Sequence, residues 1–293
     1  MKVYIVFAIA IFATGLVNAQ EVDFDKKFDS LTKNTTGVPY GNNKATGKYY
    51  DIRGFKMYTE VYGKGQPLLI IHGNGRSMSD FVYQIPYFSK NYKVILADSR
   101  AQGRSKDAGD SLTYEMMADD YAALLDNMKI DSAYVIGWSD GGINGLLLTL
   151  RHPAKVKKLA ITGANLWPDT SAIANDVVEM IMPGYTELKN ITNKTSQQKT
   201  NYKLMRLLVE QPNISLAALQ TIHIPVLVIG GDHDIIKPRH AVTIAENIPR
   251  SYLWILPNSG HSTPLIYKDI FNKTVDTFFS KPYRKIENMD RAF

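Results

Sequence analysis

The stretch "YVIGWSDGGINGLLL", residues 134–148, sets Ser139 among glycines where one apolar run gives way to another. The run before the serine is continuous, as in a buried strand, and the run after it has helical spacing. Gly137-Trp138-Ser139-Asp140-Gly141 therefore predicts a sharp turn from strand to helix that lifts the serine hydroxyl above a sheet. The glycines two residues before and after Ser139 are needed because side chains there would collide with neighbouring backbone. The alternative is a glycine-rich turn with an incidental serine, so the partners of Ser139 decide between the two.

Apolar runs like the one before Ser139 alternate with helical segments along most of the chain. Continuous Val, Ile and Leu strands alternating with helices predict an α/β fold, with a mostly parallel sheet covered on both faces. Two alternating runs on either side of Arg53-Gly54 predict an antiparallel hairpin at one edge. Strands are predicted at 67–73, 92–98, 132–138, 156–163, 225–232 and 251–258, and helices at 79–88, 113–127, 141–150, 239–247 and 264–279.

One interval departs from this alternation of strands and helices. About 60 residues separate the strand at 156–163 from the strand at 225–232, which is too long for an ordinary crossover. The interval has the pattern of two or three amphipathic helices, and an insertion of this size on a parallel sheet usually caps an active site. We therefore predict one domain at residues 47–280 with a cap insertion at about 165–220, preceded by a polar leader at 20–46 and followed by a polar tail at 281–293.

The first residues have the pattern of a signal peptide. Lys2 precedes an apolar run of about 15 residues that ends in Val17-Asn18-Ala19, with small residues where signal peptidase cleaves. A retained membrane anchor is the alternative, but a spanning helix needs roughly 20 apolar residues. We therefore expect cleavage near Ala19, no stable membrane insertion afterwards, and a periplasmic or secreted protein that begins at Gln20.

Composition excludes several classes of site. The 293 residues contain no cysteine, which excludes disulfides, a thiolate nucleophile and a thiolate metal site. The net charge of +6 is spread along the chain, whereas nucleic-acid-binding proteins concentrate basic residues on one face, so no nucleic-acid partner is expected. No metal-ligand spacing or phosphate-binding loop is present, and no metal or cofactor is expected. The oligomeric state stays open.

A serine nucleophile needs a base, and the base needs an acid that orients it. "VLVIGGDHDIIKP" puts Asp232 and Asp234 just past a buried strand, and "LPNSGHSTP" puts His261 just past the next one. Open α/β sheets place their functional groups at these strand ends. We predict a triad of Ser139, Asp234 and His261, with Asp232 capping the loop. The structural alternatives are a helix-capping role for Asp234 and a loop histidine in His261.

An oxyanion hole would complete such a site. "LLIIHGNGRSMSDF" ends a strand in His72-Gly73 and continues into a glycine-containing loop. The backbone N–H groups of Asn74 and Asp140 are the predicted donors, since both follow strand ends beside the nucleophile. We expect His72 to hold this loop by hydrogen bonds and to take no part in the chemistry.

Together these residues resemble the α/β-hydrolase superfamily. The supporting motifs are His72-Gly73, "DSRAQGRS" at 98–105, "GWSDGG" at 137–142, "GDHD" at 231–234 and Gly260-His261, and the likeness covers about residues 48–280. The stretch from 137 to 165 further resembles the valacyclovir-hydrolase-like branch, serine esterases that accept α-amino-acid esters. That likeness implies that Asp140 pairs with a substrate ammonium, and capping of the following helix is the alternative. A serine at the elbow disfavours haloalkane dehalogenases and most epoxide hydrolases, whose covalent intermediate needs a carboxylate, and "HGNG" disfavours proline iminopeptidases.

We therefore expect a serine hydrolase that cleaves a carboxylic ester, or an amide, of a small molecule. Arg76 and Asp140, with Trp167 and Met182 of the insertion, are the predicted substrate-binding residues; Asn165, Leu166 and Tyr185 are further candidates, and for each residue of the insertion packing between cap and sheet is the alternative. Two other functions stay open. One is cleavage of a carbon–carbon bond on the same triad, for which Arg76 would stabilise an enolate. The other is a ligand-binding scaffold without turnover.

Overall fold

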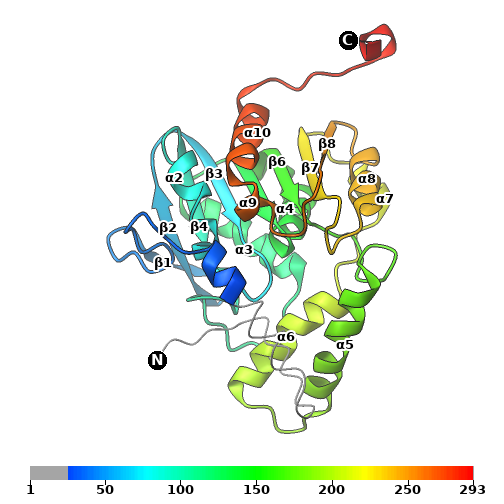
Figure 1. Cartoon of the computed structure of the whole chain (residues 1–293). Coiled ribbons are helices and arrows are strands. Elements are labelled where there is room, and N and C mark those ends of the chain that lie inside the picture. The colour runs from blue at the N-terminus through cyan, green and yellow to red at the C-terminus, as the bar shows by residue number, and fades with distance from the viewer. Residues whose placement is uncertain (1–25, 293) are drawn as a thin grey trace.

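Eight strands form a single sheet in the computed structural model, which describes residues 26–292 (Figure 1). The predicted signal peptide at 1–19 and the first residues of the predicted leader lie outside the described residues. The order across the sheet is β1-β2-β4-β3-β5-β6-β7-β8. The strands are β1 (Lys48–Ile52), β2 (Phe55–Tyr62), β3 (Gln66–Ile71), β4 (Tyr92–Ala97), β5 (Ala133–Trp138), β6 (Val156–Thr162), β7 (Val226–Gly231) and β8 (Ser251–Leu256).

The strand directions confirm the predicted α/β fold. β1 and β2 form the antiparallel hairpin at one edge, turning at Arg53 and Gly54, which both have positive φ. β2 runs antiparallel to β4, and every pairing from β4 to β8 is parallel. The chain moves from β3 outward to β4 and then returns to place β5 on the other side of β3. The carboxyl ends of β3 and β5 therefore flank a topological switch point, where open α/β sheets bind ligands.

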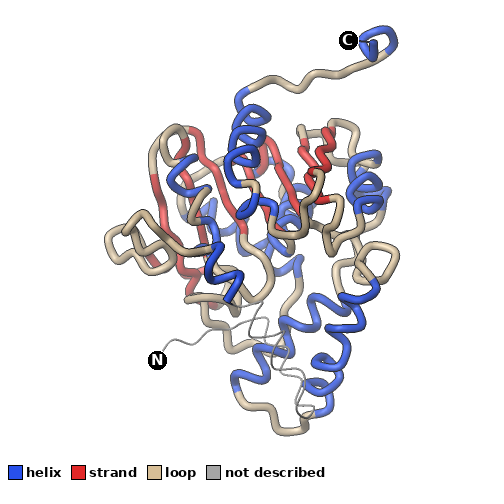
Figure 2. The backbone as a smooth tube through the Cα atoms, in the orientation of Figure 1, coloured by secondary structure: helices blue, strands red, loops and turns tan. Residues whose placement is uncertain are grey.

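Helices cover both faces of the sheet (Figure 2). α3 (Tyr114–Asn127), α4 (Asp140–Arg151) and α8 (Pro238–Glu246) contribute to one apolar core, and α2 (Gln84–Phe88) and α10 (Lys268–Ser280) contribute to the other. Successive strand residues alternate between the two cores: Leu69 and Ile71 of β3 enter the first, and Leu68 and Ile70 enter the second. Burial on both sides is why these strands are apolar throughout.

Two antiparallel helices fill the long interval between β6 and β7. α5 (Asn175–Asn190) and α6 (Ser196–Glu210) lie together at the bottom of Figure 1, and the short α7 (Leu216–Leu219) leads back to the sheet. α6 begins at a capping box in which the Thr195 hydroxyl accepts from the Gln198 N–H and the Gln198 side chain accepts from the Thr195 N–H. Leu204 and Leu207 of α6 belong to the same apolar core as α3, α4 and α8. The apolar face of α6 therefore anchors this helix on the sheet domain.

Two predicted helices are each divided in the structure. The helix expected at 79–88 is a 3-10 turn at Met78–Phe81 followed by α2, because Pro86 is tolerated only in the first turn of a helix. The helix expected at 264–279 is α9 (Thr263–Ile266) and then α10, with a break at Tyr267. Tyr267 has φ −108° and ψ 32°, and its hydroxyl donates to the carbonyl of Asn258 at 2.7 Å. That contact holds the break against the loop after β8.

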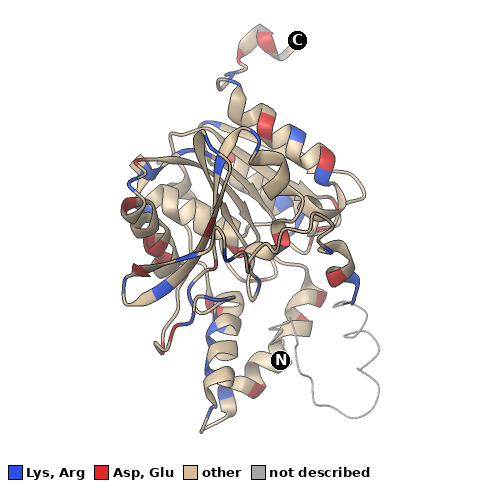
Figure 3. Ribbon diagram, turned by 90° about the vertical axis from the view of Figure 1, so that its left-hand side faces the viewer, with Lys and Arg blue, Asp and Glu red and all other residues tan. Residues whose placement is uncertain are grey.

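Charges of both signs are distributed over the helices and loops (Figure 3). Several buried charges form a network around Arg100, which donates to both oxygens of Asp120 at 2.7 and 2.8 Å and pairs with Asp107 at 3.2 Å. Asp107 also contacts the buried Lys203 of α6. No helix among residues 26–292 is long and apolar enough to cross a membrane.

The network around Asp120 predicts a large stability effect. Asp120→Asn leaves Arg100 buried with one carboxylate fewer, and we expect the free energy of unfolding to fall by about 3–5 kcal/mol. Asp51→Asn is the matched control, because Asp51 pairs with Lys56 in solvent, where ion pairs contribute little. Urea unfolding followed by circular dichroism measures both. Equal midpoints for the two variants would contradict the prediction.

Candidate active site

Ser139 lies between β5 and α4 in a backbone conformation that is rare for a residue with a side chain, φ 57° and ψ −122°. Its N–H donates to the carbonyl of Thr162 at 2.8 Å, which holds the turn against β6. A Cβ on Gly137 would lie 2.2 Å from the carbonyl oxygen of Gly141, and one on Gly141 would lie 2.0 Å from that of Ile71. Both glycines are therefore required by close backbone contact.

Asp234 and His261 come together from the ends of β7 and β8. His261 Nδ1 donates to Asp234 Oδ1 at 2.7 Å, and the Ile236 N–H donates to the same oxygen at 3.0 Å. Asp234 is buried, and its Oδ2 has no hydrogen-bond partner among the described residues. Gly163 lies directly against this pair, since a Cβ there would be 2.5 Å from His261 Cε1. The contact with Asp234 fixes the orientation of the imidazole.

Asp232 binds the loop after β8, whereas Asp234 binds His261 itself. Its two carboxylate oxygens accept from the N–H groups of Asn258 and Ser259 at 2.9 and 3.0 Å, and Oδ1 also contacts His233 Nδ1 at 2.8 Å. These contacts lower the pKa of Asp232 to about 2, the His233 contact most of all. Asp232 thus ties the end of β7 to the loop that carries His261.

Ser139 and His261 line one cavity of about 200 Å³. The hydrogen bonds of His261 use its Nδ1 and its carbonyl oxygen, which accepts from Trp138 Nε1 at 2.8 Å. Its Nε2 therefore has no hydrogen-bond partner among the described residues. In free enzymes the contact between nucleophile and base is often long and tightens when substrate binds.

The amides of Asn74 and Asp140 also border this cavity. Neither N–H donates a hydrogen bond within residues 26–292, although both follow strand ends where the backbone is packed. The Asn74 loop is held from outside: the Gly75 N–H donates to Gln102 Oε1 at 2.7 Å, and buried His72 accepts from the Ser99 N–H at 2.9 Å. Burial lowers the pKa of His72 to about 4, so its imidazole is neutral at pH 7. The structure thus keeps two donors unused and fixed beside Ser139.

Most of the cavity wall is apolar and comes from the interval between β6 and β7. Val177, Met180 and Ile181 of α5 line it at helical spacing, and Ile173 and Leu208 belong to the same interval. Ile235 and Ile236, from the stretch after β7, extend this wall. The spacing i, i+3, i+4 in α5 is the signal that would have found these residues in the sequence. The polar lining, apart from Ser139, His261 and Arg76, consists of Asn74, Tyr114, Asp140, Asn165, Gln211 and Ser262.

Four of the residues expected near the substrate are placed elsewhere. Met182 is one position beyond the inward face of α5 and is exposed. Trp167 turns away because its Nε1 donates to Ser171 Oγ at 2.6 Å and its ring packs edge-on against His240. Leu166 and Tyr185 are buried but do not line the cavity. Asn165 does line it.

Arg76 lines the cavity, but its charge is already paired. Its Nε and Nη2 donate to the two oxygens of Asp80 at 2.9 and 3.1 Å, and its guanidinium lies over the ring of Phe28 at 3.6 Å from the centroid. Arg76 is the only lysine or arginine among the described residues that line this cavity. The described lining of the cavity therefore offers no unpaired lysine or arginine to a developing enolate.

The carboxylate of Asp140 is buried at the polar end of the cavity. Asn74 Nδ2 donates to Asp140 Oδ2 at 2.8 Å and to the carbonyl of Leu204 in α6 at 3.2 Å. Burial raises the pKa of Asp140 to about 6, and hydrogen bonds from Tyr114 and Asn74 reduce that rise. Asn74 thus joins Asp140 to the helical interval on the far side of the cavity.

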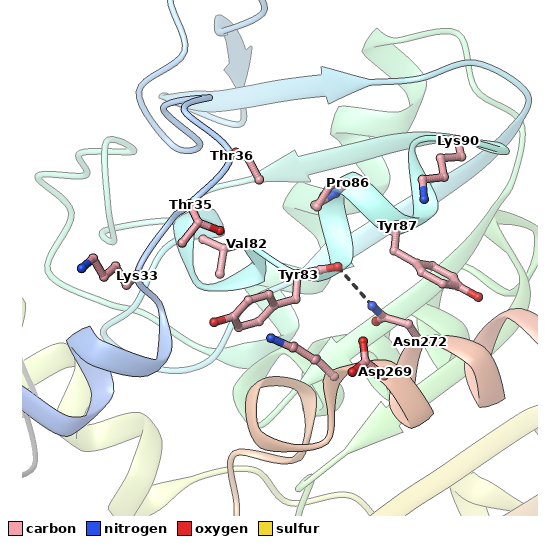
Figure 4. Close-up of a pocket in the computed structure, with 11 residues that line it drawn as sticks. Lys33, Thr35, Thr36, Val82, Tyr83, Pro86, Tyr87, Lys90, Asp269 and Asn272 are labelled. Atoms are coloured by element: carbon pink, nitrogen blue, oxygen red, sulfur yellow. Dashed lines mark hydrogen bonds between the residues drawn. The ribbon is translucent and has the colours of Figure 1, made fainter.

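A second cavity, of about 270 Å³, lies between α2, α10 and the stretch at 33–36 (Figure 4). Lys33, Lys90, Lys268, Tyr83 and Tyr87 are among its lining residues, and Asn272 Nδ2 donates to the carbonyl of Tyr83 at 3.1 Å. None of the described residues that line it is a serine or a histidine, whereas Ser139 and His261 of the predicted triad line the first cavity. Within 26–292 there is also no group of three His, Cys, Asp or Glu placed to hold a metal ion.

Known proteins share this architecture. A family model described as the alpha/beta hydrolase fold matches residues 66–212, which is half of the chain. The chain belongs to the α/β-hydrolase family. It is 26% identical to serine hydrolase BPHL from Homo sapiens over 250 residues, which cover 78% of this chain and 84% of that protein. It is 24% identical to a 2-hydroxymuconate semialdehyde hydrolase from a Pseudomonas strain, with 82% and 96% covered. The enol-lactonase from Burkholderia xenovorans has the same fold, with a TM-score of 0.66 at 20% identity over 80% of this chain and all of that one.

The buried carboxylate of Asp140 predicts a pH-dependent difference between the wild type and Asp140→Asn. Between its ordinary value of 3.8 and about 6, the carboxyl ionises in the unfolded chain but stays protonated in the folded one. The wild type therefore loses stability relative to the variant as pH rises through this window, by about 3 kcal/mol in total, and the difference is constant above pH 7. Urea unfolding of both proteins at pH 4, 5, 6 and 7.5 measures it. A difference that does not change with pH would refute the assignment.

Proposed function

We propose that this protein hydrolyses carboxylic esters of small molecules, with Ser139 as nucleophile, His261 as general base and Asp234 as the residue that orients His261. Family membership supports hydrolysis of a small ester-like substrate. The observation that carries the proposal is the 2.7 Å contact from His261 Nδ1 to Asp234, made by a histidine that shares a cavity with strained Ser139. A neutral imidazole whose Nδ1–H is taken by a carboxylate has a free lone pair on Nε2 with which to accept the serine proton.

In the first half-reaction, Ser139 Oγ attacks the ester carbonyl carbon while its proton passes to His261 Nε2. The carbonyl oxygen becomes an oxyanion, and the N–H groups of Asn74 and Asp140 stabilise it, each by on the order of 3 kcal/mol. When the tetrahedral intermediate collapses, the carbon–oxygen bond to the alcohol breaks and the alcohol leaves with the proton from His261. An acyl group then remains on Ser139.

Water completes the cycle. His261 takes a proton from water as its oxygen attacks the acyl carbon, and the same two N–H groups stabilise the second oxyanion. Collapse returns the proton to Ser139 Oγ and releases the acid. The apolar wall from α5 supports this chemistry, because hydrogen bonds to developing charge are stronger where water is scarce.

Only the chemical class of the ester is proposed. The apolar wall favours a hydrophobic group in the substrate, and the α-amino ester class that Asp140 implies is tested by including an α-amino-acid ester and its deaminated analogue among the substrates. Carbon–carbon cleavage is the weaker candidate, because the guanidinium of Arg76 is paired with Asp80. Product analysis separates the two: an ester yields an acid and an alcohol, and a β-diketone yields an acid and a ketone.

Ser139→Ala removes the nucleophile, and we expect kcat/KM for short p-nitrophenyl esters to fall by a factor of about 10⁴ or more. The wild type, prepared identically, is the reference. Labelling by a fluorophosphonate, followed by peptide mass analysis, is expected to modify Ser139 alone. Saturable ester binding without turnover in the wild type would instead favour a ligand-binding scaffold.

The two neighbouring aspartates provide a matched pair. Asp234→Asn removes the acceptor that keeps the correct imidazole tautomer, and we expect kcat to fall by roughly 10³–10⁴. Asp232→Asn affects the contacts to the N–H groups of Asn258 and Ser259 and to His233, none of which is a residue of the candidate triad, so a loss of less than about tenfold is expected. Steady-state kinetics at one pH compares them. Equal losses would show that the acid has been misassigned.

A further inference from the structure

The segment before β1 is fastened to the hydrolase domain at several points. Buried Glu60 of β2 accepts from the N–H groups of Gly41 and Asn43 at 2.9 and 2.7 Å. The hydroxyls of Tyr58 and Tyr62 donate to the same carboxylate, both at 2.7 Å. Upstream of that anchor, residues 33–36 run along the cavity beside α2 and α10 (Figure 4). The described part of the predicted leader therefore wraps the domain.

The start of this segment reaches the candidate active site. Residues 26–31 form a short helical turn, the blue helix that lies between the sheet and α6 in Figure 1. Its neighbours Lys26, Lys27, Asp29 and Ser30 are exposed, whereas Phe28 is only 7% exposed. Phe28 lines the same cavity as Ser139 and His261. The turn has two apolar residues, Phe28 and Leu31, and of these only Phe28 lines the cavity, where it acts as an anchor.

The contacts of Phe28 fix its ring beside the reacting groups. It stacks on Trp138 with 6.1 Å between centroids and 14° between planes. Trp138 precedes Ser139 and donates to the carbonyl of His261. On another side the guanidinium of Arg76 lies over the Phe28 ring, and Asp80 holds that guanidinium with two hydrogen bonds. The ring is therefore a rigid part of the wall.

We propose that Phe28, carried by the segment that precedes the hydrolase domain, sets the size limit for the apolar group of the substrate. The inference rests on the proposed ester hydrolysis and adds to it a specificity-determining residue outside the catalytic domain. The apolar residues of α5 line the cavity from a different part of the chain, so Phe28 and α5 together limit the apolar space. Replacing the ring by a smaller side chain lengthens that space, and a larger ring shortens it.

The test compares Phe28→Ala and Phe28→Trp with the wild type in the full chain. The substrates are p-nitrophenyl esters of increasing acyl length and alkyl butyrates of increasing alcohol length. We expect Phe28→Ala to move the optimum of kcat/KM toward longer chains in one series, and Phe28→Trp to move it toward shorter chains in the same series. Each methylene that becomes buried should raise kcat/KM roughly fourfold. Lys27→Ala, exposed in the same turn, is the matched control with an unchanged profile.

The readouts separate this inference from its alternatives. Opposite shifts of the optimum support it, and they do not depend on absolute activity or on loss of some folded protein. A uniform fall in kcat for every chain length would overturn it, since that result means that Phe28 only supports Trp138 and His261. Unchanged profiles in both variants would overturn it as well. If hydrolysis by the wild type does not depend on Ser139, the proposed function fails instead, and Ser139→Ala measured alongside distinguishes that case.

Discussion

The backbone contact between the start of α4 and the end of β3 constrains everything around it. No side chain fits at Gly141, whose added Cβ would meet the Ile71 carbonyl at 2.0 Å, or at Gly137, which faces Gly141 in the same way. This close approach forces Ser139 into a positive φ and brings the Asp140 amide toward the loop after β3. The strain is compensated by the hydrogen bond from Ser139 N–H to Thr162 and by the packing of α4 on the sheet. The serine can therefore project into the cavity without relaxing.

The rest of the site depends on strand order. Because β3 and β5 are neighbours and β7 and β8 follow on the same side, the carboxyl ends of these strands lie along one edge of the sheet. The residues of the candidate triad follow three different strands, with Ser139 after β5, Asp234 after β7 and His261 after β8. Of the two proposed oxyanion donors, Asn74 follows β3 and Asp140 shares the end of β5 with Ser139. Each loop is held by a partner outside the reacting set: Gln102 for the loop of Asn74, Thr162 for Ser139 and Asp232 for the loop of His261. Such support from neighbouring groups keeps a catalytic geometry in place before substrate arrives.

The helical interval and the segment before β1 give this site its walls. α5 supplies an apolar face, α6 is joined to Asn74 and Asp140 through the Leu204 carbonyl, and Phe28 closes another side against Trp138. The resulting burial is also what raises the pKa of Asp140. Residues that line the cavity and residues that anchor its walls are thus closely connected, and Lys203 beside Asp107 extends that connection to the buried network of Arg100.

The sequence by itself determined the α/β fold, because continuous apolar strands that alternate with helical segments are typical of a parallel sheet covered on both faces. It also identified Ser139, Asp234 and His261 as the candidate triad, since each follows a strand end and local chemistry restricts what those positions can be. It could not decide which residues of the insertion face the cavity, so Met182 and Trp167 were expected where Met180, Ile181 and Val177 lie. One position along α5 turns a side chain by about 100°, and only packing against the sheet sets that rotation. The tertiary structure alone brought Phe28 to Trp138 and paired Arg76 with Asp80, because contacts between distant segments leave no periodic pattern in the chain.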